Sequence, residues 1–264
     1  MEKQTDETYG VSVVMPAYNA AATIQRAIDS VIGQSYGNWE LIVVNDCSSD
    51  ETADILKKYS DKYQQIHIIT NEINSGVAYA RNRGVQAAKN EWIAFLDSDD
   101  YWETEKLEQQ LAMIKKHPDM KMCFTASAFI DEKGRKSEYI LHVPEKVVYE
   151  ELLKQNIISC SSVLITRDLM TKYPMISKKE IHEDFVTWLK ILKEIPYAVG
   201  VDRPLLIYQL SAKSKSGNKL KAAKMQWNSY RVCEVPLVKS INCFNRYAYR
   251  NILKYKEILA GNTG

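Results

Sequence analysis

"WIAFLDSDDYWETEK", residues 92–106, sets an apolar run directly before three aspartates. Residues 92–96 are apolar enough to form a strand covered on both faces, and such strands belong to parallel sheets. Asp97 and Asp99 follow, and because side chains alternate along a strand, we expect both carboxylates on one side of the sheet's carboxyl edge. Open α/β folds bind ligands at that edge. Two carboxylates this close repel each other unless a cation or protons neutralise them, so the stretch predicts a site for Mg²⁺ or Mn²⁺.

The chain before this stretch alternates predicted strands and helices with short connections. The predicted strands are 11–16, 39–46 and 66–70, and the predicted helices are 19–35, opened by Asn19, 52–63, preceded by Ser49 and Asp50 in capping positions, and 75–90. This β-α-β order implies right-handed crossovers and a parallel sheet. A nucleotide-binding α/β fold is the natural inference.

The second half of the chain has a less regular pattern. We expect strands at 120–131 and 161–166, helices at 145–156 and 182–195, paired strands around a turn within 197–210, and helix from about 218 to the end, broken at Pro236. No linker rich in Gly, Pro or Ser separates the halves. The second half is therefore expected to complete the same domain.

Composition indicates an ordinary globular chain. The 264 residues are 45% hydrophobic and 26% charged, enough to bury one large domain with a tail. The charged start lacks an apolar segment, and no run of about 18 apolar residues occurs, so we expect a cytoplasmic protein without a signal peptide or membrane span. The five cysteines are scattered and form no C-x-x-C pair, which favours reduced thiols over disulfides or a zinc site.

Charge is distributed unevenly along the chain. From Lys213 onward there are eleven Lys and Arg against Glu234 and Glu257, a net +9, so the rest carries −7 to give the overall +2. Aromatic residues are interleaved with these cations: Trp227, Tyr230, Phe244, Tyr247, Tyr249 and Tyr255. Such a tail suits an anionic membrane surface or nucleic acid. The alternative is an amphipathic helical tail that packs its aromatics on the main domain. We expect no nucleic-acid partner and possible peripheral contact with the inner membrane leaflet.

Polar residues mark the carboxyl ends of the predicted strands in four short motifs. These are "VSVVMPAYN" at 11–19, "NDCSSD" at 45–50, "NSGVAYARNRG" at 74–84 and "DSDD" at 97–100. In these motifs the sequence resembles the family-2 inverting glycosyltransferases, which have the GT-A nucleotide-sugar fold. Each motif alone is weak, but four in order at the expected strand ends are specific.

The resemblance implies a GT-A fold, that is, a Rossmann-like, mostly parallel α/β sheet, followed by a helical basic C-terminal tail. We expect a disordered start at 1–10 and a glycosyltransferase domain at 11–217. Within that domain, 11–100 would be the nucleotide-binding half and 101–217 the acceptor half. Residues 218–264 would form the helical basic extension.

The implied activity is metal-dependent, inverting transfer of a hexosyl group from a nucleotide-diphospho-sugar, expected to be a UDP-sugar, to an acceptor hydroxyl. The loop from Pro16 through Tyr18 to Asn19 can offer a flat apolar surface and backbone partners to a uracil ring. Asp46 suits a ribose hydroxyl or a base N–H, and Arg81 a base carbonyl or the diphosphate. Asn74 and Ser98 complete the expected donor site. The resemblance makes Asp99 the metal ligand, with Asp97 bridging to the metal or to ribose, and Mn²⁺ or Mg²⁺ the cofactor.

Inversion requires a general base on the face of the sugar opposite the leaving group. "IHEDFVTWLK" at 181–190 resembles the family's acidic base motif, which implies that Asp184 is the base and that Glu183 orients it or binds the acceptor. Beside them, we expect His182 to be structural or to face the acceptor. The family's usual acceptors imply a glycan or a lipid-linked glycan, in bacterial surface glycan biosynthesis.

Each of these residues also has a simpler structural explanation. Asp46 and Asp50 can cap a helix. Arg81 can pair with a surface carboxylate. Glu183 and Asp184 are ordinary first-turn residues that favour the helix dipole.

One segment departs from the family pattern. Relatives often follow the late strand with Tyr-Arg-x-His, whereas this chain reads "YQLSAKSKSGNK", with Gln209 and Ser211 in those places. A serine cannot replace an imidazole as a strong ligand, so we expect Lys213, Lys215 or Lys219 to contact the diphosphate from a flexible loop.

Two other functions share parts of this pattern. A sugar-phosphate nucleotidyltransferase also places carboxylates at a sheet edge, but it needs a Gly-rich basic phosphate loop after the first strand, where this chain has "PAYNAAATI". A non-catalytic nucleotide-sugar-binding subunit would keep the fold, but both acidic motifs are retained here.

Overall fold

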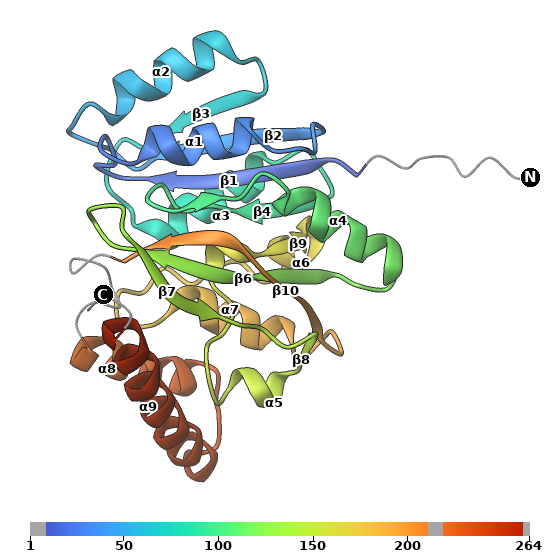
Figure 1. Ribbon diagram of the computed structural model, residues 1–264, viewed down its shortest axis with the longest axis vertical. Helices are drawn as coiled ribbons and strands as arrows, with labels where there is room; N and C mark the ends of the chain where they lie inside the picture. The colour runs from blue at the N-terminus through green and yellow to red at the C-terminus, as the bar shows by residue number, and fades with distance from the viewer. Residues whose placement is uncertain (1–8, 211–218, 261–264) are drawn as a thin grey trace, which may run out of the picture.

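A computed structural model describes residues 9–210 and 219–260, with side chains through residue 250. One mixed sheet runs through the molecule with strand order β3-β2-β1-β4-β9-β6-β10-β5, and β7 and β8 pair with β6 and β10 (Figure 1). Buried side chains form one core on each face of the sheet. The α/β class expected from the sequence is confirmed.

The first half forms a parallel sheet with helical crossovers, as predicted. Its elements are β1 (Val11–Ala17), α1 (Ile24–Ile32), β2 (Trp39–Asn45), α2 (Thr52–Lys62), β3 (Ile66–Thr70), α3 (Val77–Ala87) and β4 (Trp92–Phe95). β1 lies between β2 and β4, and β3 pairs with β2, all in parallel. Glycine is required at position 84, because a Cβ there would lie 2.4 Å from a methyl of Val14, so α3 packs directly on β1.

The predicted start of the first helix at Asn19 is wrong. α1 begins at Ile24, and Asn19 has a φ of 48°, outside the helical range. Its side-chain oxygen accepts a hydrogen bond from the backbone N–H of Ser49 at 2.8 Å. Asn19 therefore joins the loop after β1 to the loop after β2.

The second half adds antiparallel strands to this sheet. Its elements are β5 (Tyr101–Trp102), α4 (Lys106–Lys116), β6 (Met122–Ile130), β7 (Lys136–Leu141), β8 (Lys146–Val147), α5 (Tyr149–Leu152), the 3₁₀ helix η1 (Cys160–Ser162), β9 (Leu164–Thr166), α6 (Arg167–Lys172), α7 (Glu183–Ile191) and β10 (Ala198–Gln209). β9 pairs antiparallel with both β4 and β6, so it connects the two halves of the sheet. β10 runs parallel to β6.

Two elements of the second half differ from the prediction. Residues 197–210 form the single strand β10 rather than paired strands; its register shifts around Pro204, which has no N–H to donate to the neighbouring strand. The helix expected at 145–156 is only one turn, α5, because Val147 is buried in β8, where it pairs with Ala198 of β10.

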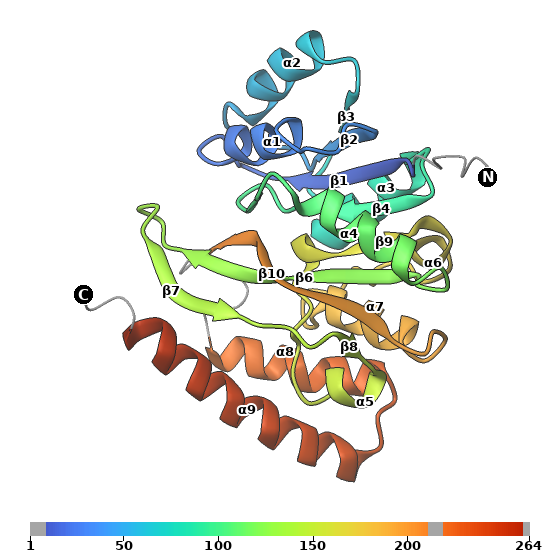
Figure 2. The ribbon, with the colours of Figure 1, turned by 45° about the vertical axis from the view of Figure 1, so that its right-hand side comes forward.

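The C-terminal helices pack against the domain that was predicted to end at residue 217. α8 (Lys219–Val232) and α9 (Leu237–Ala260) flank Pro236, as expected, and lie side by side below the sheet (Figure 2). Tyr230 is fully buried; its hydroxyl donates to the carbonyl of Leu153 at 2.7 Å, and its ring packs against Phe185. The alternative expectation, that the C-terminal tail packs its aromatic residues on the main domain, is therefore correct for α8. Within the described residues, no helix has the length and apolarity needed to cross a bilayer.

Candidate active site

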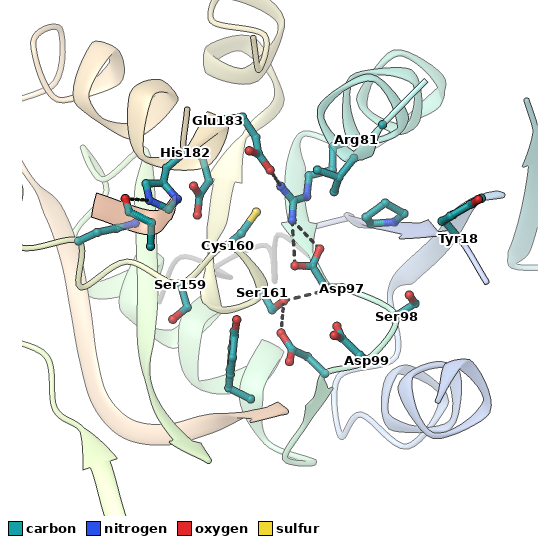
Figure 3. Close-up of a pocket in the computed structure, with 18 of the residues that line it drawn as sticks. Tyr18, Arg81, Asp97, Ser98, Asp99, Ser159, Cys160, Ser161, His182 and Glu183 are labelled. Carbon is teal, nitrogen blue, oxygen red and sulfur yellow. Dashed lines mark hydrogen bonds and ion pairs between the residues drawn. The ribbon is translucent and has the colours of Figure 1, made fainter. Parts of the chain in front are cut away.

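A cavity of about 950 Å³ opens at the carboxyl ends of β1, β2 and β4. One end is lined by the predicted donor residues: Pro16, Tyr18, Asn19, Asp46, Asn74, Arg81, Asp97, Ser98 and Asp99. The other end is lined by the α7 start and by parts of β6, β10, α8 and α9. Figure 3 shows Tyr18 and His182 on opposite sides, with Arg81 and Asp97 between them. The fold thus brings both predicted acidic motifs into one cavity.

Arg81 joins the two acidic motifs directly (Figure 3). One terminal nitrogen donates to both carboxylate oxygens of Asp97, at 2.6 and 2.8 Å, and the other donates to Glu183 at 3.2 Å. The Arg81 side chain is only 5% exposed. Its guanidinium is engaged by two carboxylates, as the ion-pair alternative anticipated, although these carboxylates lie inside the site rather than at the surface. The expected contact of Arg81 with the base or the diphosphate stays a prediction.

The aspartate motif is a turn rather than a strand end. β4 stops at Phe95, and the N–H of Asp100 donates to the carbonyl of Asp97 at 3.1 Å. Strand alternation therefore does not position Asp99, contrary to the prediction. Asp100 is buried and fixes the turn: it accepts hydrogen bonds from the Ser161 hydroxyl at 2.7 Å and the Gln209 N–H at 3.0 Å.

Asp99 is the carboxylate of this turn that remains available to a ligand. Among the described residues, no other residue donates a hydrogen bond to its side chain, which lines the cavity. Burial, together with the neighbouring charge of Asp97, raises the pKa of Asp99 to about 6. A nearby cation would relieve this crowding, and a hard oxygen donor suits Mg²⁺ or Mn²⁺.

The donor set fits a metal bound through one carboxylate. Asp97 already forms its bidentate pair with Arg81, and no group of three potential ligands occurs among the described His, Cys, Asp and Glu. Mg²⁺ sites commonly use one or two carboxylates and complete their coordination with water and substrate phosphates. Asp99 is thus available as the expected ligand, and the expected contribution of Asp97 to the metal or to ribose stays a prediction.

Asp46 organises the loop in front of α3. Its carboxylate accepts hydrogen bonds from the Asn71 amide at 2.6 Å and from the N–H groups of Ser75 and Gly76 at 3.0 and 2.7 Å. Gly76 is the residue directly before α3, so the carboxylate binds backbone N–H groups at the start of that helix, in line with the helix-capping alternative. Asp46 also lines the cavity, as Pro16 does.

The second acidic motif opens α7. Asp184 lines the cavity, and burial and the neighbouring Glu183 charge raise its pKa. A raised pKa suits a general base, because a base works best with a pKa near the operating pH. His182 is fixed by α8. Its backbone N–H donates to the Ser229 hydroxyl at 3.0 Å, and its ring Nε2 lies 3.2 Å from the Ala222 carbonyl oxygen.

Several cavity residues were not identified from the sequence. Ser159, Cys160 and Ser161 lie at η1, where the Ser161 hydroxyl also accepts the N–H of Asp97 at 3.0 Å. Burial raises the pKa of the Cys160 thiol. The only sequence signal was the run of small residues "SCSS" at 159–162, which overlaps the start of the strand predicted at 161–166. Gln226 of α8 and Tyr247 of α9 were assigned to the tail, and only the fold brings them to the cavity.

The segment that departs from the family pattern is partly visible. Gln209 accepts a hydrogen bond from Arg26, whose guanidinium also stacks on Tyr101. Ser211, Lys213 and Lys215 lie outside the described residues, as does the side chain of Lys219. The expected lysine contacts with the diphosphate therefore stay a prediction.

Comparison with known proteins identifies the family. The family model described as "Glycosyl transferase family 2" matches residues 12–172. The chain belongs to glycosyltransferase family 2. It is 38% identical over 92% of its length to the putative teichuronic acid biosynthesis glycosyltransferase TuaG of Bacillus subtilis, of which it covers 96%. It is also 38% identical to the Escherichia coli UDP-Glc:alpha-D-GlcNAc-diphosphoundecaprenol beta-1,3-glucosyltransferase WfgD, over 84% of this chain and 85% of WfgD.

Solved structures support the GT-A fold of this family-2 chain. Staphylococcus aureus TarS in complex with UDP-GlcNAc matches with a TM-score of 0.72 at 20% identity, over 86% of this chain and 66% of that one. The mannosyltransferase PcManGT from Pyrobaculum calidifontis, in complex with GDP-Man and Mn²⁺, matches with a TM-score of 0.71 at 15% identity, over 97% and 74%. Family membership makes the chain a glycosyltransferase, with the inverting stereochemistry consistent with family 2, and argues against the nucleotidyltransferase alternative.

Proposed function

We propose that this glycosyltransferase moves a sugar from a UDP-sugar to a hydroxyl of a lipid-linked glycan during bacterial surface glycan assembly. The observation that carries the proposal is the placement of Asp99 and Asp184 in one cavity, one on the aspartate turn and one at the start of α7. Inverting transfer needs a group that meets the leaving diphosphate and a base that meets the acceptor. The two carboxylates are assigned to these two tasks.

The donor occupies the end of the cavity formed by the first half of the chain. Tyr18 and Pro16 offer apolar surface to the uracil, and the Asp46 carboxylate accepts from a base or ribose group in addition to the loop it already holds. Asn74 and Ser98 supply further polar contacts. Arg81 serves this end indirectly, because its bidentate bond fixes the orientation of Asp97 beside the aspartate turn. The named donor of WfgD and the UDP-GlcNAc bound to TarS support a UDP-sugar.

Asp99 would hold the divalent cation together with the diphosphate of the donor. When bound, Mn²⁺ or Mg²⁺ neutralises the negative charge that develops on the departing nucleoside diphosphate. Asp184 removes the proton from the acceptor hydroxyl as its oxygen attacks the anomeric carbon. Glu183, held by Arg81, keeps a second negative charge beside the base and so contributes to its raised pKa.

Release of nucleoside diphosphate tests this proposal directly. Purified protein is incubated with each of several UDP-sugars and Mn²⁺, with and without an acceptor, and the UDP released is measured. We expect slow release without acceptor and loss of release in EDTA. Release of pyrophosphate from UTP and a sugar phosphate, with no turnover of UDP-sugars, would overturn the assignment in favour of a nucleotidyltransferase. Donor binding without any turnover would indicate the non-catalytic subunit.

A lipid-linked acceptor would place the enzyme at the inner membrane leaflet, and α9 offers a suitable surface. Its outer side exposes the side chains of Leu237, Val238, Ile241 and Tyr249, while Arg246 and Arg250 are also exposed. The opposite side of α9 packs on the protein through Cys243 and Phe244. Exposed apolar side chains next to cations are the two ingredients of interfacial binding.

Membrane binding is measured by cosedimentation with anionic phosphatidylglycerol vesicles. Val238 is 74% exposed, so Val238→Ser with Ile241→Ser should weaken binding without disturbing the fold. Ile73→Ser, at an equally exposed site on the donor half, is the matched control. Truncation after residue 217 is unsuitable, because it removes the buried Tyr230. Binding that is absent, or equal in both variants and unaffected by about 0.5 M NaCl, would contradict the membrane contact.

A further inference from the structure

We propose that Gln226 of α8 and Asn156 form a polar subsite that binds hydroxyl groups of the acceptor sugar. This inference rests on the proposed glycosyl transfer to a sugar acceptor. It assigns part of the acceptor site to a helix that the sequence had placed in a basic tail.

Gln226 is a buried amide that lines the cavity. Only 1% of the residue is exposed, and its amide oxygen has no hydrogen-bond partner among the described residues. The hydroxyl of Tyr230, one turn further along α8, donates its proton to the carbonyl of Leu153. It can therefore only accept from the Gln226 amide N–H, a contact that partly offsets the rise in the pKa of Tyr230 caused by burial, and cannot serve the amide oxygen. A buried polar group without a partner destabilises the folded protein, and native structures contain few of them. A ligand that enters the cavity would supply the missing partner.

Asn156 presents a second such group. Its side-chain oxygen is buried and has no partner within the described part of the chain, and the residue lines the same cavity. The bond from Tyr230 to Leu153 ties the segment that leads to Asn156 against α8, on the side that carries Gln226. The two amides therefore reach the cavity from two segments that are packed together.

The proposed base lies at the same end of the cavity. His182, two residues before Asp184, contacts the carbonyl of Ala222, which lies one helical turn before Gln226. Asp184, Gln226 and Asn156 all line the cavity, whereas the donor residues line its other end. A sugar whose hydroxyl is deprotonated by Asp184 is thus the molecule best placed to meet the two amides.

Amide side chains match the chemistry of a sugar. Each carries two donors and one acceptor oxygen, and each sugar hydroxyl both donates and accepts. A leucine would fill the Gln226 position without leaving polar atoms unpaired, so packing alone gives no reason for an amide there. A site built to bond a hydroxyl also rejects analogues that lack it, because the buried amide is then left unpaired.

The test compares Gln226→Leu with Gln155→Leu, which removes a glutamine that does not line the cavity and bonds Arg250 instead. The acceptor probe is N-acetylglucosaminyl diphosphoundecaprenol in detergent, the acceptor class named for WfgD. We expect Gln226→Leu to lower kcat/KM for the acceptor by about tenfold, or about 1.4 kcal/mol. Acceptor-independent UDP release should be unchanged, and the Tm equal or higher. Gln155→Leu should leave kcat/KM unchanged.

Deoxygenated acceptors give the second readout. If Gln226 bonds one hydroxyl of the acceptor, the wild-type enzyme should lose as much activity on the acceptor that lacks this hydroxyl as Gln226→Leu loses on the complete acceptor. Removing both the amide and the hydroxyl should then cost no more activity than removing either one alone. Asn156→Ala should couple to a different hydroxyl.

The outcomes separate this subsite from the proposed function. The subsite is overturned if wild type and Gln226→Leu have equal kcat/KM for the acceptor, or if the activity losses from the variant and from each deoxy acceptor simply add. Either result would leave the proposed glycosyl transfer intact. A lower Tm together with the lower kcat/KM would show that the amide has a structural partner and would also overturn it. UDP release that no lipid-linked sugar accelerates contradicts the proposed acceptor class, and the subsite with it.

Discussion

Replacing Arg81 by methionine tests whether this arginine is a structural link or a donor ligand. The variant removes the three hydrogen bonds from the guanidinium to Asp97 and Glu183, a longer one to the Met175 sulfur, and the positive charge between the two carboxylates. Their side chains are 29% and 7% exposed, so Glu183 meets little solvent. Removing one partner of a buried ion pair costs about 3–5 kcal/mol, and we expect the lower end because Asp97 is partly solvated.

A loss of about 3 kcal/mol corresponds to a Tm lowered by roughly 6–12 °C in a chain of this size. The measurement is thermal unfolding followed by circular dichroism, with urea unfolding as a second estimate. Arg83→Met is the matched control, because Arg83 lies in the same helix and bonds the Thr70 carbonyl and the Asn71 amide oxygen, which are uncharged. Its Tm should fall by less than about 3 °C, since exposed single bonds contribute about 1 kcal/mol or less.

Rescue distinguishes the two roles of Arg81 further. Neutralising the two carboxylates that Arg81 bonds, with Asp97→Asn and Glu183→Gln in the Arg81→Met background, should recover much of the lost stability. A Tm of Arg81→Met within about 2 °C of the wild type, together with a weaker donor affinity, would refute the structural role and support the donor contact first expected from the sequence.

Three further results are expected. Asp99→Asn should abolish metal-dependent transfer with an unchanged Tm, because no other described residue donates a hydrogen bond to this side chain; wild-type turnover in a Mn²⁺ titration would contradict the metal role. Asp184→Asn should lower kcat by at least about 10²-fold with a nearly unchanged donor Kd, and collapse of donor affinity with kcat preserved would move the base elsewhere. Lys106→Met should stabilise the protein at pH 6, because burial lowers the pKa of this fully buried lysine to about 7, below its usual 10.5. Below pH 7 the wild type therefore carries the full free-energy cost of burying the charged lysine. This cost shrinks as the pH rises and is absent above about 10.5, so the free energy of unfolding of the wild type should approach that of the variant between pH 7 and 10. The shift sets a ceiling of about 5 kcal/mol, and the contact of Lys106 with the Trp102 ring offsets part of it. Urea midpoints at pH 6 and 9 measure the gap, and a gap independent of pH would rule out this explanation.

The sequence by itself determined the parallel half of the fold. Residues 11–95 contain apolar runs and amphipathic segments whose periods of two and 3.6 residues specify strands and helices locally. Parallel strands require crossovers, and these are right-handed, so this order leaves few topologies. The strand ends then fix where Asp46 and Asp97 must lie. These local signals were sufficient to predict the cavity at the sheet edge, although Asn19 was misread as a helix start because its left-handed conformation depends on the Ser49 loop.

Only the tertiary structure decided how these residues are paired. Arg81 bonds Asp97, 16 positions further along the chain, and Glu183, 102 positions further along. No periodicity or spacing in the sequence specifies a contact over such a distance. The partners of Asp46, the turn that carries Asp99 and the buried amide of Gln226 likewise depend on loops and helices from separate parts of the chain.

The C-terminal helices show the physical reason most clearly. Their composition, cations interleaved with aromatics, is compatible with both a solvated tail and a packed wall of the cavity. The choice depends on whether a complementary apolar surface exists, and that surface is provided by Phe185 of α7 and its neighbours in the core. Local sequence sets what a segment can bury, whereas the rest of the fold sets what it is buried against.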